Sequence, residues 1–216
     1  MRRMTYWSRA IQSHVRNMKS WYIFVTVLFL MGMIFGALIV NTLDPKQQEG
    51  LVYYLSYFFR GLEQNSITEP SVAFQHSFGE HLKTLGIMWL LGLSVIGIPI
   101  LLLFVFYKGL VIGFTVGFLA HQLSLKGLWF ASLSIVPQNL VIVPAILIIA
   151  VSGIHFSITL VQNRLLHHRG TIYPQFVSFS LLATCMMVVF LGASVWEAYL
   201  TPELMKGNIP TFTLSN

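Results

Sequence analysis

Apolar residues run through this chain in long stretches, each of which ends at a short polar segment. Residues 21–40 contain no charged side chain and follow a basic segment, residues 1–20. A helix of about 20 apolar residues is long enough to cross the hydrocarbon core of a bilayer. Trp21 and Tyr22 begin the run, where interfacial aromatic side chains are common. No Ala-x-Ala motif precedes Asn41, so the pattern predicts an uncleaved transmembrane helix over residues 21–40 and a cytoplasmic N-terminal segment.

The remaining spans are expected within residues 84–200, as a helical membrane bundle. They cover residues 84–107, 109–123, 128–161 and 176–196, and charged or polar residues bound them, with Lys108 between the first two. The second is only about 15 residues long, so a re-entrant segment is the alternative to a full crossing. The third would extend about 50 Å against about 30 Å of hydrocarbon, so it must tilt, break or project. The pattern predicts an all-α, polytopic membrane protein with about five transmembrane helices.

The long apolar run over residues 128–161 contains a polar interruption. Pro137 is followed by Gln138 and Asn139, and Pro144 comes about two turns later. Proline lacks the N–H group that a helix requires, and amide side chains in hydrocarbon need hydrogen-bond partners. We therefore expect the helix to break at Pro137, with the two amides clamping the freed backbone groups. A substrate or ion site is the alternative.

Residues 41–83 form the largest polar segment between the expected spans. Asp44-Pro45 is a helix-start signal, and apolar residues follow at helical spacing with tyrosines among them: Leu51, Tyr53, Tyr54, Leu55, Tyr57, Phe58 and Leu62. The pattern predicts an amphipathic helix, suited to the membrane surface or to packing on the protein's own spans. A second short helix is expected over residues 71–83, leading into the membrane.

Composition excludes a soluble fold. Only 9% of the 216 residues are charged and 56% are hydrophobic, with a mean hydropathy of +0.73. Soluble domains carry about 25% charged residues. The net charge of +6 does not indicate a nucleic-acid partner, because the basic residues do not gather on a soluble domain.

The basic residues indicate topology instead. With five spans and a cytoplasmic N-terminus, eight basic residues fall inside: Arg2, Arg3, Arg9, Arg16, Lys19, Lys108, Arg164 and Arg169. Five fall outside: Lys46, Arg60, Lys83, Lys126 and Lys206. This excess agrees with the positive-inside rule. Residues 41–83 and the tail, residues 201–216, are then extracytoplasmic.

Glycine spacing points to close helix packing. Gly109, Gly113 and Gly117 recur every four residues on one helix face, and Gly32 and Gly36 repeat the spacing in the first span. Small residues at this spacing allow two helix backbones to approach closely in lipid. We expect a helix–helix interface, either within the chain or between two copies in a homodimer. Chance placement of glycine is the alternative.

Catalytic patterns are missing from the sequence. No Asp or Glu lies inside an expected span, because Glu197 falls at the end of the last one. There is no Gly-Lys dipeptide of a phosphate-binding loop, and Cys185 is the single cysteine. His76 and His81 flank Glu80, but five-residue spacing places the two rings on different sides of a helix, so we expect a solvated pair. The sequence predicts no enzymatic activity, no metal site and no cofactor.

Several segments carry a resemblance to a known family. They are residues 22–25, 30–37, 53–55, 107–114 and 137–145. Through them the chain resembles the stage II sporulation protein M family of endospore-forming bacteria over essentially its full length. Members of the wider family tend to show a Pro-His-Gly-x-x-Glu-x-Pro-Ala segment. Here Pro137, Pro144 and Ala145 match, whereas Gln138, Asn139 and Ile142 stand where the wider family has His, Gly and Glu.

The resemblance implies a role in engulfment of the forespore. It implies a multi-pass protein of the cell membrane, on the mother-cell side of the sporulation septum and of the engulfing membrane. Its implied partners are stage II sporulation proteins P and D, which degrade peptidoglycan and thin the septal wall. Residues 41–83 are the expected docking region, with Tyr54, Phe58 and Arg60 as the named contacts.

A transporter-like membrane subunit, either a permease or a channel, is the main alternative function. Broken helices and amides within the membrane occur at transporter sites, and the run around Pro137 has both features. An enzyme ranks third, because no catalytic set is present.

The charge distribution makes one topology prediction. Five spans place the C-terminus on the opposite side of the membrane from the basic N-terminus. A reporter that is active only outside the cytoplasm should therefore function when fused to Asn216. Activity of a reporter that works only in the cytoplasm, fused at the same position, would exclude an odd number of spans.

Overall fold

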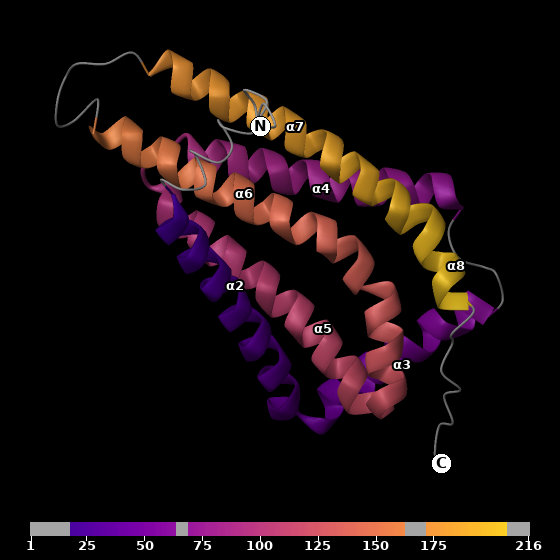
Figure 1. Cartoon of the computed structure of the whole chain (residues 1–216). Helices are drawn as coiled ribbons and strands as arrows, with labels where there is room; N and C mark the ends of the chain where they lie inside the picture. The colour runs from indigo at the N-terminus through magenta and orange to yellow at the C-terminus, as the bar shows by residue number, and fades with distance from the viewer. Residues whose placement is uncertain (1–17, 64–68, 163–171, 207–216) are drawn as a thin grey trace, which may run out of the picture.

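The computed structural model describes residues 18–63, 69–162 and 172–206, and the regular structure within them is helical (Figure 1). The elements are α2 (Lys19–Ile39), η1 (Val40–Thr42), α3 (Pro45–Glu63), α4 (Pro70–Gly92), α5 (Gly97–Ser134), α6 (Val136–Val161), α7 (Tyr173–Val195), the π-helical η3 (Trp196–Leu200) and α8 (Thr201–Lys206). Four stretches of the described chain are long and apolar enough to cross a membrane: Lys19–Thr42, Gly97–Ser134, Val136–Val161 and Tyr173–Met205. The predicted all-α membrane fold is confirmed.

Local sequence signals explain where the helices begin. α4, α6 and α7 each carry a proline in the first turn, Pro70, Pro137 and Pro174, where the missing N–H group costs nothing. At the start of α3, the backbone N–H of Asp44 donates to Oε1 of Gln47 at 3.1 Å. This is one half of a capping box, and it fixes the end of the helix that the Asp44-Pro45 signal predicts.

Contacts between the helices show that the chain traverses the bundle five times. α2, α5 and α7 run in one direction, and α4 and α6 return. The pairs of residues that fix these directions are Gly32–Phe106, Gly36–Leu110, Ser77–Glu197, Trp89–Ser180 and Gly153–Leu101. Lys19 and Lys206 therefore lie at opposite ends of the bundle. We call the end that holds α3 and α8, at the lower right of Figure 1, the α3 end.

The contact of α2 with α5 is a contact of two backbones. A Cβ atom added to Gly32 or Gly36 would meet the backbone of Phe106 or Leu110. In the other direction, Gly109, Gly113 and Gly117 lie against the backbones of Phe29, Met33 and Ala37. All five predicted glycines thus face each other within one chain, which permits the close approach that small residues give in membranes. A homodimer would need another surface.

The structure corrects the expected spans over residues 84–107 and 109–123. The chain turns at residues 93–96 and then continues as α5, so residues 109–123 are the second half of a helix that begins at Gly97 and breaks at Ser124, and not a separate short span. A Cβ at Gly97 would meet the backbone of Leu91, so the turn requires glycine there, and Pro99 lies in the first turn of α5. Lys108 lies within α5 and does not end a helix. Its Nζ lies 5.7 Å from the centre of the Phe104 ring on the same helix, so the charged group is accommodated there.

The expected boundary between residues 83 and 84 is also wrong. α4 is one continuous helix across it, so residues 70–83 belong to the bundle and only α3 lies apart. The far end of α4 is fixed from α6, since Oγ of the buried Ser157 donates to the carbonyl of Gly92 at 2.7 Å. A buried hydroxyl and a helix-terminal carbonyl satisfy each other in this contact.

The polar interruption after residue 134 divides two helices, α5 and α6. Ile135 lies between them, and the side-chain Nδ2 of Asn139 donates to its carbonyl at 2.8 Å. Asn139 therefore clamps the break next to Pro137. Gln138 is not part of this clamp. Pro144 lies inside α6, which is curved in Figure 1, and prolines commonly bend helices in this way. A second break in α5 occurs at Ser124, whose φ of 53° is rare for a residue with a side chain.

The glycine contact generates a stability prediction. Gly113→Ala adds a methyl group that would lie 2.6 Å from Cα of Met33, so α2 and α5 must separate. We expect a loss of about 1–3 kcal/mol in the free energy of unfolding, typical of overpacking. Gly192→Ala in α7 is the control, because nothing lies within 4 Å of its added Cβ. Equal stability of the two variants in denaturant titrations would contradict the contact.

Candidate functional site

α3 exposes a row of tyrosine side chains at the α3 end of the bundle. Tyr53, Tyr54 and Tyr57 are 68%, 72% and 72% exposed, and Arg60 is exposed on the next turn. Residues three and four apart share a helix face, so Tyr53, Tyr57 and Arg60 form one continuous surface. Aromatic and arginine side chains are the commonest anchors of protein interfaces, and here several are presented together.

A buried aromatic residue, Phe59, packs α3 against the bundle. Phe59 is only 3% exposed, and its ring meets that of Phe130 edge to face, with 5.1 Å between the centroids. Leu119 and Ala131 of α5 complete this small core, and Leu55 packs against it from α3. From the sequence, Phe58 is expected as a partner contact, and Phe59 is not singled out. The structure places Phe58 at the margin, where it remains 41% exposed.

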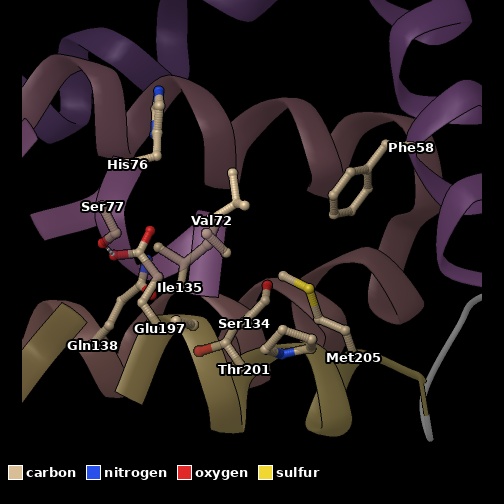
Figure 2. Close-up of a pocket in the computed structure, with 13 residues that line it drawn as sticks. Phe58, Val72, His76, Ser77, Ser134, Ile135, Gln138, Glu197, Thr201 and Met205 are labelled. Carbon is tan, nitrogen blue, oxygen red and sulfur yellow. Dashed lines mark hydrogen bonds between the residues drawn. The ribbon is translucent and has the colours of Figure 1, made fainter. Parts of the chain in front are cut away.

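A cavity of about 620 Å³ lies between α3, α4 and the helix ends around residues 134–138 and 197–205. Its lining is mostly apolar, with Phe58, Val72, Ile135 and Met205 among the contributors. In the view of Figure 2, the polar side chains of Ser77, Gln138 and Glu197 gather at one end and Phe58 lies at the other. Its volume lies within the range of about 300–1,000 Å³ that is usual for small-molecule sites.

Glu197 carries the charge of this cavity. Oγ of Ser77 donates to Oε2 of Glu197 at 2.5 Å, and Nε2 of His81 lies 3.3 Å from the same oxygen. The corresponding sequence expectation is wrong in two respects. The last apolar stretch extends past Glu197 to Met205, and the His81 side chain is mostly buried against α7 and not solvated. Both errors arise because the partners of these residues come from a helix more than 100 positions away.

Serine, histidine and glutamate meet here without the geometry of a nucleophilic triad. A triad requires the serine hydroxyl to donate to histidine, which then donates to the carboxylate. Here Ser77 and His81 both contact the carboxylate of Glu197, so the histidine cannot accept the serine proton. Within the part of the chain that the structure describes, no three His, Cys, Asp or Glu residues lie close enough to hold a metal ion.

Gln138, in the first turn of α6, lines the cavity and takes no part in the clamp. Its Oε1 is buried and has no hydrogen-bond partner among the described residues. Leaving a buried acceptor without a partner costs about 1–3 kcal/mol. In the sequence, two amides beside a proline indicate that hydrogen-bonding groups are needed there. Only the fold shows that Asn139 bonds to the backbone at the break whereas Gln138 lines the cavity.

The anchor of α3 can be tested by mutation. Phe59→Ala removes the ring that packs on Phe130, and we expect about 3 kcal/mol less stabilisation of α3 on the bundle. Amide hydrogen exchange over residues 45–63 should accelerate accordingly, while exchange in α6 stays unchanged. Tyr57→Ala, at an exposed position of the same helix, is the control. Equal exchange in the two variants would show that Phe59 does not anchor α3.

Comparison with known proteins places the chain in a family. The family model described as stage II sporulation protein M matches residues 25–202. No curated protein and no solved structure matches the chain. The matched range begins within α2 and ends within α8, so it includes α3 and most of the bundle and of the cavity lining. The chain is therefore a membrane protein that belongs to the stage II sporulation protein M family.

Proposed function

We propose that this chain is a non-enzymatic membrane scaffold that recruits peptidoglycan-degrading partners to the sporulation septum, for septal thinning and forespore engulfment. The partners proposed are stage II sporulation proteins P and D. The observation that carries the proposal is the exposed face of α3, where three tyrosines and Arg60 lie on a helix that the buried ring of Phe59 packs against the bundle.

The directions of the helices are consistent with docking outside the cytoplasm. Because the chain traverses the bundle five times, α3 lies at the end opposite to Lys19 and the basic N-terminal segment. If that segment is cytoplasmic, as its basic residues favour, α3 faces the compartment that contains the cell wall. Enzymes that degrade peptidoglycan act in that compartment, so the exposed face and its proposed partners would meet on the same side.

The bundle interior favours a scaffold over a transporter-like subunit. Most of its fully buried residues are apolar: Val25, Met88, Leu101, Val105, Ile149, Val151 and Ile154. Two described serines, Ser157 and Ser194, are also fully buried, and each donates to a backbone carbonyl. A solute path through the membrane requires polar groups along its length. The cavity at Glu197 lies at the α3 end only, beside the helix ends.

Recruitment should depend on the exposed face of α3. Interface anchors contribute about 2 kcal/mol or more each, so Tyr54→Ala with Arg60→Ala should weaken partner binding at least about tenfold. Both residues are exposed, so the protein itself should accumulate normally in the membrane. Fluorescent fusions of the two hydrolases should then fail to gather at the septum of sporulating cells.

Tyr173→Ala provides a matched control for this experiment. Tyr173 is 71% exposed, but it begins α7 at the end of the bundle opposite to α3. Normal recruitment by the Tyr54 and Arg60 double variant would contradict the docking face. Phe58→Ala is tested separately, because Phe58 also lines the cavity. Transport of a solute by purified protein in sealed vesicles would favour the transporter-like alternative.

A further inference from the structure

We propose that the cavity at the α3 end binds the ammonium headgroup of a membrane lipid, an aminophospholipid such as phosphatidylethanolamine. The carboxylate of Glu197 would receive the ammonium group, and the apolar lining would contact the two methylene groups beside it, with the phosphate outside the cavity. This inference is independent of partner docking.

The charge of the cavity selects a cation. Glu197 is the one carboxylate among the 13 residues that line it, no Lys or Arg is among them, and His76 is the other titratable residue of the lining. Ser77 and His81 both contact Oε2, whereas Oε1 makes no hydrogen bond with the described residues. A carboxylate held in this way has one oxygen left for a donor, and hydrogen bonds between charged groups are the strongest that proteins form.

Gln138 adds an acceptor that has no partner of its own. Its Oε1 is buried without a hydrogen bond, and the residue belongs to the cavity lining. In Figure 2 its side chain is drawn at the same end as Glu197 and Ser77. An ammonium group donates up to three hydrogen bonds, so one group can serve more than one acceptor, here the free oxygen of Glu197 and Oε1 of Gln138. A trimethylated headgroup has no such donor.

The position of the cavity relative to the membrane surface favours a lipid over a soluble amine. Trp196 and Tyr199 flank Glu197 on η3 and are exposed, and Trp129 is exposed on α5 near the same end. Exposed tryptophan and tyrosine side chains mark the level of lipid headgroups in membrane proteins. The carboxylate therefore lies at the height at which a headgroup is found, and apolar helix surface continues from there into the bilayer.

Native mass spectrometry of the purified full-length protein tests the assignment. The protein is offered equal amounts of phosphatidylethanolamine, phosphatidylcholine and phosphatidylglycerol with matched acyl chains. We expect retention of phosphatidylethanolamine to exceed that of the other two about tenfold, because only its headgroup contains a cationic group that donates hydrogen bonds. Equal retention of the three lipids would overturn the proposal.

Two variants and one control connect the preference to the cavity. Glu197→Gln keeps an acceptor for Ser77 but removes the charge, and Ala73→Leu adds bulk to the lining from α4. Each should abolish the preference for phosphatidylethanolamine. Glu203→Gln removes an exposed charge on α8, outside the lining, and should leave the preference intact. Loss in the control, or a preference retained by both cavity variants, would contradict the site.

A final arm distinguishes the lipid from a free amine. Dodecylamine carries the same ammonium group without phosphate or glycerol, and it should displace phosphatidylethanolamine from the unmodified protein. If dodecylamine is retained but phosphatidylethanolamine is not, the cavity is a site for free amines and the assignment to lipid is wrong.

Discussion

Two parallel helices in backbone contact impose the architecture of this protein. α2 and α5 meet through glycines on both sides, and they run in the same direction. Helices that follow one another through a short turn run in opposite directions, so the chain between them must return across the bundle first. α4 makes that return, and α3 lies across the end where the return begins. The glycine contact thus places an amphipathic helix outside the bundle, at the end remote from Lys19.

The other features of the α3 end follow from that arrangement. Because α4 returns through the bundle, its polar face must find partners there, and the continuation of α7 supplies Glu197 to Ser77 and His81. The small core around Phe59 and Phe130 fixes α3 over the same region. A cavity with one carboxylate remains between these elements, beneath a helix whose tyrosines face outward. Partner docking and lipid binding are therefore proposed for neighbouring but separate surfaces.

Sequence reasoning predicts what depends on periodicity and fails where distant residues decide. It predicts the helical membrane fold, a close contact at the glycine repeats and a break beside Pro137. It misses the turn before Gly97, because Lys108 is the more conspicuous interruption although its side chain is accommodated on the helix. The anchoring role of Phe59 is also not visible in the sequence, because its partner Phe130 lies far along the chain. Glu197 likewise acquires its role only from α4.

Site-specific photo-crosslinking in sporulating cells tests the central claim, that the outer face of α3 meets the recruited partners. A crosslinking amino acid replaces Tyr57 on that face or Tyr173 at the opposite end, both of which are strongly exposed. The account predicts covalent adducts with stage II sporulation protein P or D from position 57 and none from position 173. Adducts from position 173 alone, or none from position 57 while both hydrolases are at the septum, would contradict it.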